Sequence, residues 1–550
     1  MTVTEAPRDV LDVAAVDTEP VSPTGLAALV GSGDPRSIGK LYIGTSLLFL
    51  LVAGVTGVLV GFEQVDVDKP DNVLSADTLA QVYTLHSISG LFLVVLPLLL
   101  GIALAVVPLQ LGASTVAFPR AAAASYWVFL VGGGLVLTSY AVNGGPFGGE
   151  ADGVALFVAS LVAVLLALCT ASVSVATTVV ALRAPGLSLR RAPLFSWSML
   201  VATTIWLLTL PVLAGLLVLA YVDLVYGSGF MGGADGLYNQ ILWVFWQPAV
   251  YAFAIPALGI IADIVPVFAQ RRLKRHSAAM FLVGLFGALS FGAWAQAGID
   301  TFAADDADLT PWLHDGPWIV VSWAIVLPVL ALLGLWSSTL AAGKVKVASP
   351  LLFALASGLL LLVGVAAGAA TSIDALDLVG STWMTAQTYA VLLAALTAGF
   401  GGLVFWAPKL YGNLLSEATA RLVATLLLIG TLVLAVPYAV AGLLDQQRLL
   451  AFDTSGIDEV GTVETLNLVS AIGGVVVVVG ALLGILAVLG ARVGRGTGPG
   501  DDPWNGHTLE WATSSPPPVG NFPSLPEITS EAPLYDARHA ALRDTTEASA

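Results

Sequence analysis

Twelve segments of about 20 mostly apolar residues divide this chain, and they limit its fold more than any other feature. An α-helix of that length crosses the hydrocarbon core of a bilayer. The segments lie near residues 40–62, 82–108, 122–143, 153–182, 195–222, 239–268, 278–299, 317–341, 349–371, 383–407, 419–444 and 464–491. Of the 550 residues, 57% are hydrophobic and 11% are charged, which is too apolar for a water-soluble protein of this size. The sequence therefore predicts an all-α integral membrane protein, a twelve-transmembrane-helix bundle in contact with the lipid bilayer.

The charged residues between the segments predict the orientation of the bundle. Basic residues gather in alternate loops, at Arg36, Lys40, Arg120, Arg183, Arg190, Arg191, Arg271, Arg272, Lys274, Arg275, Lys344, Lys346, Lys409, Arg421, Arg492 and Arg495. The other loops carry acidic residues, at Glu63, Asp66, Asp68, Asp71, Glu150, Asp152, Asp305, Asp306, Asp308, Asp315, Asp453, Asp458 and Glu459. Only Lys69 and Arg448 depart from this alternation. Because loops rich in Lys and Arg stay inside, we expect both termini in the cytoplasm.

Two tails flank the membrane domain, which we place at residues 35–495. Residues 1–34 are polar and acidic without an apolar signal-peptide core, and we expect a disordered cytoplasmic tail. Residues 496–550 contain GTGPGDDP and SSPPP, which favour an irregular, extended cytoplasmic tail. The net charge of −16 argues against nucleic acid as a partner. The single cysteine, Cys169, lies in an apolar segment, which excludes disulfides and cysteine-ligated metal sites.

Few polar residues lie deep in the apolar segments, and those that do are the candidate functional residues. His86 is the one histidine within a segment, since His276, His314, His507 and His539 fall in loops or the tail. Asp263 lies near the inner end of its segment, where we expect lipid headgroups and water to solvate it. The other deep polar groups are Gln247, Tyr251, Gln296, Gln387 and Tyr389. A proton pump or ion-coupled carrier needs titratable groups at depth, and this bundle is short of them.

Several stretches, in chain order, resemble subunit I of cytochrome c oxidase, the main subunit of the haem–copper oxidases. They are LYIGTSLLFLL (41–51), YTLHSISGLFLVVLPLLLG (83–101), VPLQLGASTVAFPR (107–120), SYWVFL (125–130), RAPGLSLRRAPLFSWS (183–198), WQPAVYAFAIPALGIIADIVPVF (246–268), FWAPKLYG (405–412) and WNGHTLEWATSSPPPVGNF (504–522). The resemblance covers the chain from about residue 35 to 540. It implies the twelve-helix fold of that subunit, a multi-pass location in a bacterial-type cell membrane, and other membrane subunits as partners.

Members of the family that this chain resembles bind their metals through six membrane histidines. Three of these histidines bind the haem groups. In the family a second-span histidine binds the low-spin haem, and His86 matches it. A His-x-His pair in the tenth span binds the high-spin haem and then the low-spin haem. Gln387 and Tyr389 stand at those two positions here. A carboxamide is a weak ligand for haem iron, and phenolate ligation is rare, so any haem would depend on His86.

The second set of histidines binds copper in the family. Its sixth span carries His-Pro-Glu-Val-Tyr, where this chain has Gln247, Ala249 and Tyr251 in place of the histidine, the proton-relaying glutamate and the redox-active tyrosine. Two seventh-span histidines correspond to Gln296 and Ala297. Five of the six histidine positions therefore lack imidazole, and we expect no copper site.

Other functional positions of the family are also changed. The lysine of the family's proton path aligns with Leu332, and an aspartate before the Ala-Phe-Pro-Arg motif aligns with Thr115. Of two arginines that neutralise the haem propionates, Arg448 remains and Gln447 replaces the other. No His-Asp pair precedes Gln387, so the family's outer magnesium site is also in doubt. Metal, haem and proton-path positions are lost together, which argues against oxygen reduction.

Three functions follow from this pattern. The first is a non-catalytic homologue without haem or copper, which serves as a structural or assembly subunit of a respiratory membrane complex. The second is an electron-transfer protein with one haem at His86. The third is a transport protein, or a lipid- or quinone-binding protein, that reuses the vacated haem pocket.

A buried polar group must find a hydrogen-bond partner, and this requirement gives a structural prediction. We expect the side chains of Gln247, Tyr251, Gln296, Gln387 and Tyr389 to bond to one another or to water. We also expect the vacated cofactor space to be filled by larger side chains, closer helices or lipid, because empty cavities destabilise a fold.

Overall fold

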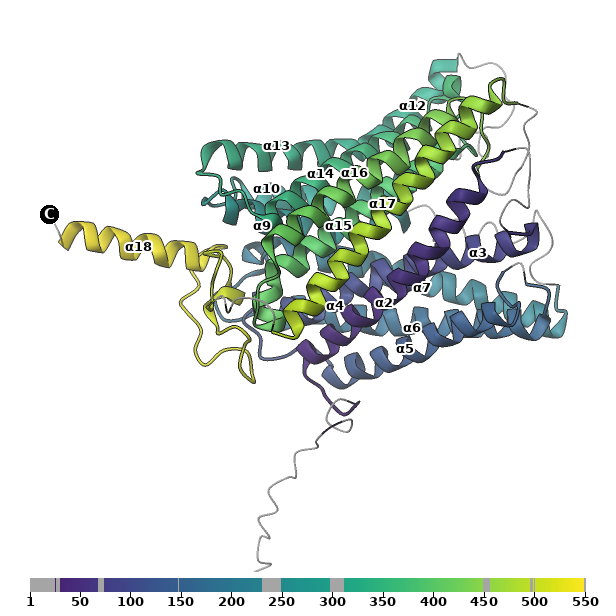
Figure 1. Cartoon of the computed structure of the whole chain (residues 1–550). Helices are drawn as coiled ribbons and strands as arrows, with labels where there is room; N and C mark the ends of the chain where they lie inside the picture. The colour runs from purple at the N-terminus through teal and green to yellow at the C-terminus, as the bar shows by residue number, and fades with distance from the viewer. Residues whose placement is uncertain are drawn as a thin grey trace, which may run out of the picture.

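The computed structural model describes residues 30–67, 74–146, 148–229, 249–296, 311–448, 456–494 and 500–548, with the single residues 25 and 498. Gln247 and Ala297, two of the candidate positions, lie outside the described residues. The predicted N-terminal tail also lies mostly outside them. Within these ranges the chain is a bundle of long helices, and one further helix extends from one end of it (Figure 1).

Twelve helical spans in the described part of the chain are long and apolar enough to cross a membrane, which confirms the predicted number. They are Pro35–Glu63, Ala76–Gln110, Pro119–Ala141, Ala151–Ala181, Leu194–Tyr226, Ala249–Phe268, His276–Ala293, Gly316–Ala342, Ser349–Ala370, Thr382–Tyr411, Glu417–Gly442 and Val460–Arg492. The protein is therefore an all-α, multi-pass membrane protein.

Some of these spans consist of one helix and others of two or three consecutive helices. They are α2 (Pro35–Glu63), α3 (Ala76–Ile88), η1 (Ser89–Val95), α4 (Leu96–Gln110), α5 (Pro119–Ala141), α6 (Ala151–Ala181), α7 (Leu194–Tyr226), α9 (Ile255–Phe268), α10 (His276–Ser290), η3 (Phe291–Gln296), α12 (Pro311–Ala324), α13 (Val326–Ala342), α14 (Ser349–Ala370), α15 (Thr382–Tyr411), α16 (Glu417–Gly442) and α17 (Val460–Arg492).

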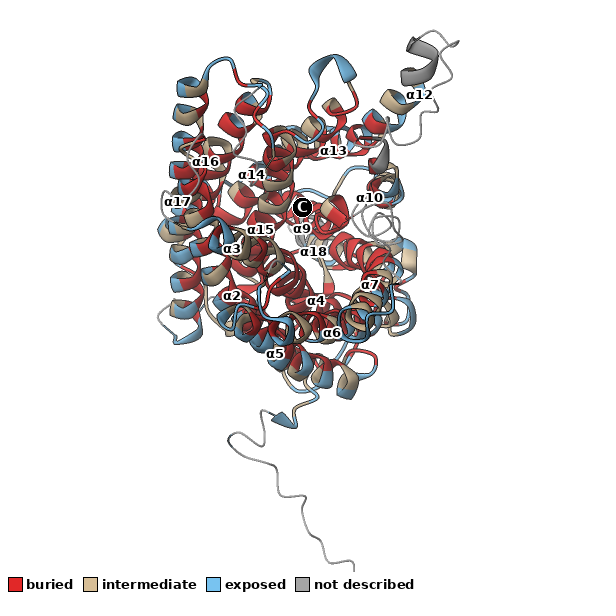
Figure 2. Ribbon diagram, turned by 90° about the vertical axis from the view of Figure 1, so that its right-hand side faces the viewer, coloured by how far each residue is buried: buried red, intermediate tan, exposed pale blue. Residues whose placement is uncertain are grey.

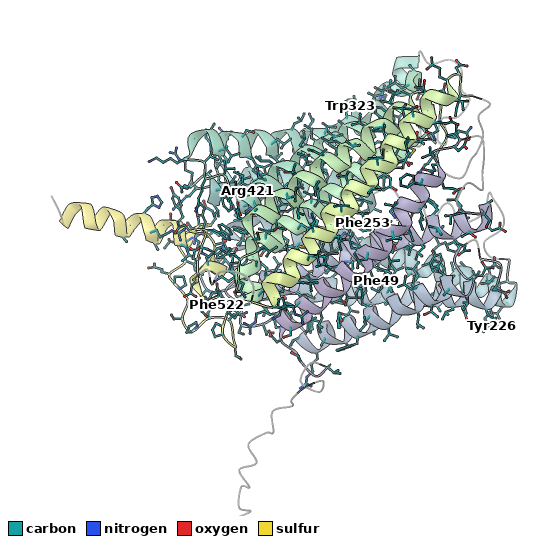
Figure 3. All side chains as sticks on the ribbon, in the orientation of Figure 1. Phe49, Tyr226, Phe253, Trp323, Arg421 and Phe522 are labelled. Carbon is teal, nitrogen blue, oxygen red and sulfur yellow. The ribbon has the colours of Figure 1, made fainter. Side chains whose placement is uncertain are left out.

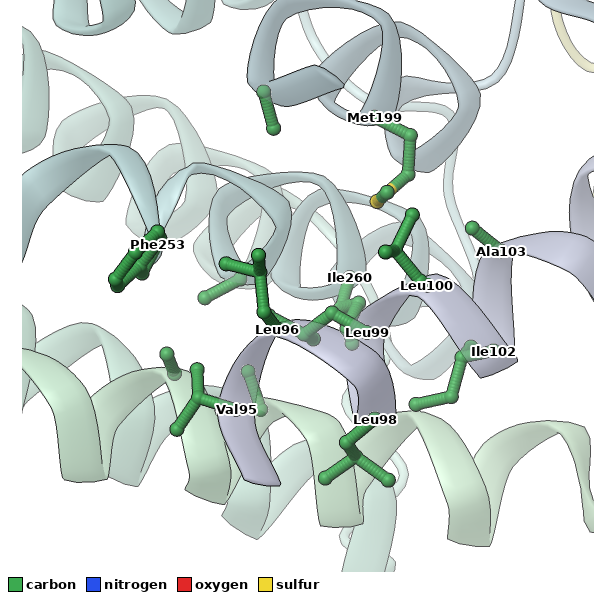
Figure 4. Close-up of a cluster of buried hydrophobic side chains, with 14 of the residues drawn as sticks. Val95, Leu96, Leu98, Leu99, Leu100, Ile102, Ala103, Met199, Phe253 and Ile260 are labelled. Carbon is green, nitrogen blue, oxygen red and sulfur yellow. The ribbon is translucent and has the colours of Figure 1, made fainter. Parts of the chain in front are cut away.

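Three spans form the centre of the bundle. In one apolar stretch of 18 residues within each span, about nine-tenths of the residues are buried, for Ala76–Gln110 (89%), Ala249–Phe268 (94%) and Thr382–Tyr411 (89%). In Figure 2, α4, α9 and α15 lie inside a ring of helices whose outward faces are exposed. A helix that is apolar on every side is buried by its neighbours, as α4 is in Figure 4, where Leu96 and Leu99 pack near Phe253 and Ile260. These central spans carry His86 on α3, Gln387 and Tyr389 on α15, and Tyr251 just before α9.

A π-helical segment, η1, joins α3 to α4 within one membrane span. In it the backbone N–H of Leu96 donates to the carbonyl of Leu91. Pro97 follows and has no backbone N–H to donate to the carbonyl of Leu93. Its ring also crowds that Leu93 carbonyl, which explains why the regular α-helical hydrogen bonds are interrupted here. Such wide turns occur often at functional sites. Gly90 lies in this segment, and a Cβ added to it would meet open space.

The C-terminal tail packs onto one end of the bundle, which we call the tail face. Leu509, Glu510 and Trp511 of the short helix η5 (Leu509–Ala512) are buried there. The Lys409 ammonium donates to the carbonyls of Asp501 (2.9 Å) and Thr513 (2.6 Å). Figure 3 places Phe522 at this end and Tyr226 at the other.

This tail differs from the extended segment that we expected. Its coil is anchored by buried side chains, and it ends in the helix α18 (Pro533–Ala548). The Pro and Gly residues that suggested extension do prevent regular structure between residues 513 and 532. Tertiary contacts, which local composition does not reveal, hold that irregular chain in place.

Candidate functional site

A chain of three buried side chains connects three membrane spans at the centre of the bundle. Tyr251 lies one turn before α9, Gln296 ends η3, and Gln387 lies in the second turn of α15. The Gln387 amide donates to the Tyr251 hydroxyl oxygen at 2.8 Å, and that hydroxyl donates to Gln296 Oε1 at 2.8 Å. The Gln296 amide donates in turn to the carbonyl of Ser322 at 3.3 Å. We call Tyr251, Gln296 and Gln387 the amide–phenol chain.

A glycine allows these side chains to meet. A Cβ at Gly368 of α14 would lie 2.5 Å from Gln387 Nε2, 2.9 Å from Gln296 Oε1 and closer still to the Tyr251 oxygen. Any larger residue at position 368 would therefore occupy the space of the chain itself. The Thr371 hydroxyl, one turn further along, donates to the Gln296 carbonyl at 2.6 Å. The helix α14 thus closes the site from one side.

His86 and Tyr389 form a second polar pair, on α3 and α15. The ring nitrogen Nδ1 of His86 lies 2.7 Å from the carbonyl of Ala53, and Nε2 lies 3.0 Å from the Tyr389 hydroxyl. Because a carbonyl oxygen only accepts, Nδ1 carries a proton. In the neutral ring Nε2 is then the acceptor, and Tyr389 donates to it. Gly57 leaves room for the ring, since a Cβ there would lie 2.6 Å from it.

These contacts confirm the hydrogen-bond prediction for Tyr251, Gln296 and Gln387. The Tyr389 hydroxyl bonds instead to His86, which was not among its expected partners, and Gln247 lies outside the described residues. The two polar groups also differ in packing. The amide–phenol chain is closed by direct contacts and by Gly368. Beside His86 and Tyr389, in contrast, a cavity of about 310 Å³ remains. We expected larger side chains, closer helices or lipid to fill the vacated space; on the His86 side the side chains and helices do not fill it, and lipid stays the prediction there.

Arg448 lies at one end of this cavity, just beyond α16. Its backbone N–H donates to the carbonyl of Gly380 at 2.6 Å, and Gln447 forms an isolated bridge with Ser381. These bonds fix Arg448 beside the first turn of α15. No ion pair between its guanidinium and a carboxylate is present in the described part of the chain.

The sequence did not indicate a buried polar cluster at the tail face. Asp263 is only 9% exposed, so the expectation that headgroups and water solvate it is wrong. Its carboxylate accepts from the backbone N–H groups of Leu194 (3.1 Å) and Phe195 (3.3 Å), which begin α7. These amides have no partner within the helix, and a negative charge is favourable there. Asp263 therefore caps a neighbouring helix.

The same cluster joins the tail to the bundle. The Gln110 amide donates to Asp263 Oδ2 (2.7 Å) and to Glu510 Oε1 (3.2 Å), and Trp406 also donates to Glu510 at 3.2 Å. Glu510 is fully buried, and burial raises the pKa of its carboxyl above the usual value. Gln110 and Glu510 both lie in sequence stretches that resemble subunit I. Gln110 and Glu510 are thus polar residues in family-like stretches, although neither stands at a metal position. That combination was the sequence signal that could have revealed this cluster.

Comparisons with known proteins agree with this architecture. A profile of the family described as "Cytochrome C and Quinol oxidase polypeptide I" matches residues 37–476. The chain belongs to this family. Members of the polypeptide I family from bacteria align with nearly its full length.

Two relatives illustrate the similarity. "Cytochrome c oxidase subunit 1" of Bacillus subtilis is 30% identical over 535 residues, which cover 94% of this chain and 84% of the relative. "Putative cytochrome c oxidase subunit 1-beta" of Streptomyces coelicolor is 31% identical over 533 residues, which cover 92% and 89%. A haem–copper terminal oxidase dimer solved by cryo-EM has the same fold, with a TM-score of 0.67, 15% identity, and coverage of 84% of this chain and 85% of that one.

The described residues do not fit the copper centre that the polypeptide I family implies. In that part of the chain no three His, Cys, Asp or Glu side chains come together in a group that could hold a metal. The described side chain at a copper position, Gln296, has its amide oxygen occupied by Tyr251. Neutral amides are weak ligands for copper compared with imidazole.

The described residues also fit a low-spin haem poorly. An iron ion bonded to both His86 Nε2 and the Tyr389 oxygen would lie about 2 Å from each, as metals do from nitrogen and oxygen ligands. The two atoms are 3.0 Å apart and share a proton instead.

At the aligned lysine position of the proton path, Leu332 is a buried apolar residue of α13.

Proposed function

We propose that the protein is a non-catalytic member of the polypeptide I family, without haem or copper, that serves as a structural or assembly subunit of a respiratory membrane complex. The observation that carries this proposal is the amide–phenol chain. Gln296 stands at an aligned copper position, Gln387 at the aligned high-spin haem position and Tyr251 at the aligned tyrosine, and the three side chains bond to one another. An assembly of hydrogen-bonded neutral groups stabilises the bundle without needing a cofactor.

The tail face supports the structural part of the proposal. Gln110, Asp263 and Glu510 form a buried network that fixes the tail on the bundle, and this network involves no metal position. A surface maintained in this way suits contact with other membrane subunits. The alternation of basic and acidic loops further suggests that this face and both termini are cytoplasmic in a bacterial cell membrane.

Cofactor content of the purified protein tests the proposal. The chain is expressed in a haem-replete host, purified in mild detergent, and assayed by pyridine haemochrome spectroscopy and by elemental analysis for copper. We expect far less than one haem and one copper per chain. One copper per chain would refute the proposal.

The retained histidine makes a single-haem protein the second candidate. His86 borders a cavity, which is the observation in its favour, and its bond to Tyr389 is the observation against it. One haem per chain without copper would establish the electron-transfer alternative.

A second experiment tests the subunit role. The chain is purified from membranes through an affinity tag, and mass spectrometry of the intact complex identifies its partners. Recovery of the chain alone would contradict a subunit role.

A further inference from the structure

The cavity beside His86 is large enough for part of an organic molecule. Its volume of about 310 Å³ is roughly twice that of an engineered protein cavity of about 150 Å³ that binds benzene, and it reaches the range typical of ligand pockets. Helices α2, α3, α15, α16 and α17 surround it, and Figure 2 shows them grouped on one side of the bundle. Because aliphatic side chains form most of its wall, water is a poor occupant.

The wall changes in polarity along the cavity. On α15 the lining residues run from Thr385 and Tyr389 near the start of the helix to Leu396 two turns further in. The lining residues of α3 and η1 run in the same order, from Tyr83 through His86 to Val94. Both helices therefore present polar groups at one end of the cavity and aliphatic groups at the other, which matches a molecule with a polar head and an apolar chain.

Two groups at the polar end lack partners among the residues that the structure describes. The Arg448 guanidinium borders the cavity, and no carboxylate of the described residues pairs with it. The Thr385 hydroxyl also lines the cavity and is 92% buried, and its oxygen has no hydrogen-bond partner in the described part of the chain. A buried hydroxyl without a partner destabilises a fold, so a ligand group that bonds to Thr385 would be favourable here. A guanidinium favours an anionic oxygen ligand.

We propose that this cavity binds an anionic amphiphile, with its charged head at Arg448 and Thr385 and an aliphatic chain along Leu396 and Val94. The inference rests on the proposed function, because a haem bound at His86 would occupy the same space. Free fatty acids and acidic phospholipids both supply this chemistry, and the experiment separates them.

The experiment measures binding of defined probes to the delipidated, detergent-solubilised protein by native mass spectrometry at pH 9. The probes are palmitate, phosphatidylglycerol and the neutral 1-hexadecanol. We expect one saturable palmitate or phosphatidylglycerol per chain, and hexadecanol should bind about tenfold more weakly than the anionic probes. Palmitate binding alone identifies a free fatty acid, and competition by phosphatidylglycerol identifies a phospholipid.

Two variants locate the site. Arg448→Gln should weaken palmitate binding about tenfold and leave hexadecanol binding unchanged, whereas Arg492→Gln, on the opposite end of the bundle, should change neither. Gly90→Leu adds a side chain where a Cβ meets open space beside the cavity, and it should abolish binding of all probes. Gly134→Leu, at an exposed position of α5 with equally open space, is the matched control.

The results distinguish the two proposals. Equal palmitate affinity in the native protein and Arg448→Gln, or equal affinity for palmitate and hexadecanol, overturns the inference. The comparison with Arg448→Gln tests the inference even if Gly90→Leu does not fold. A haemochrome spectrum of the same preparation with one haem per chain would instead overturn the proposed function.

Discussion

The side-chain amide of Gln387 donates a 2.8 Å hydrogen bond to the hydroxyl oxygen of Tyr251, although the two residues are 136 positions apart in the chain. The Tyr251 hydroxyl in turn donates a hydrogen bond to Gln296 Oε1. Tyr251 and Gln296 therefore each accept one hydrogen bond and donate another. Two positions aligned with metal ligands, Gln296 and Gln387, are thus joined through Tyr251, and this arrangement makes the three residues sensitive to substitution.

Tyr251→Phe should lower the free energy of unfolding by about 1–3 kcal/mol, because it leaves the oxygen of Gln296 and the amide of Gln387 buried without partners. The measurement is equilibrium unfolding in mixtures of mild detergent and SDS. The control is Tyr226→Phe at an exposed tyrosine, which should change that free energy by less than about 0.5 kcal/mol. Equal effects of the two substitutions would contradict the buried network.

Gly368→Ala should destabilise the bundle by about 1–3 kcal/mol, since the added methyl group would overlap the amide–phenol chain. Gly334→Ala in α13 is the matched control, because a Cβ there meets nothing within 4 Å. That control should be neutral or slightly stabilising, by up to about 1 kcal/mol, as for a glycine replaced within a helix. An unaltered midpoint for Gly368→Ala would mean that α14 does not approach the chain so closely.

Tyr389→His should allow the protein to bind one haem per chain. The substitution places a second imidazole opposite His86 and removes the hydroxyl that now lies 3.0 Å from His86 Nε2. A shorter side chain opens room for an iron ion, and imidazole is a strong haem ligand. Haem titration followed by the Soret absorbance measures the gain. Tyr389→Phe, which opens the same space without a second imidazole, should bind haem much more weakly.

Glu510→Gln should change how attachment of the tail depends on pH. Burial raises the pKa of Glu510 in the folded state above its ordinary value of 4.5. The folded state therefore holds a proton that the unfolded tail releases, so its contribution to attachment is full below about pH 4.5 and is lost as the pH rises through the folded pKa. Hydrogen exchange in Leu509–Ala512, corrected for intrinsic rates, should show protection that falls with pH more steeply in the native protein than in the variant.

Another titrating group in the tail makes a matched control necessary for this measurement. Burial lowers the pKa of His507 to about 3, so its contribution to attachment is present above the ordinary value of 6.5 and is lost as the pH falls toward 3. This opposite trend is shared by the native protein and Glu510→Gln, and their difference isolates Glu510. Glu527→Gln, at an exposed residue of the same tail, should behave as the native protein does. Identical pH profiles for all three proteins would show that Glu510 ionises normally.

Residues of the tail illustrate how far local sequence could predict this structure. Pro and Gly between residues 513 and 532 correctly indicated irregular backbone. They did not indicate that Glu510 would be buried against Gln110 and Trp406, because those partners come from other parts of the chain. Asp263 was misjudged for the same reason. Its position near the end of a span suggested solvent, but the start of α7 covers it.

The sequence by itself determined the number of membrane spans and the loss of imidazole at five aligned positions, because apolar length and residue identity are local properties. Only the tertiary structure decided which polar groups meet. His86 and Tyr389 lie 303 positions apart, and a hydropathy pattern that is similar in every span does not specify their contact. The same packing closed the amide–phenol chain and left a cavity at His86, since helix approach depends on residues such as Gly368, which leaves room for that chain, and Gly57, which leaves room for the His86 ring.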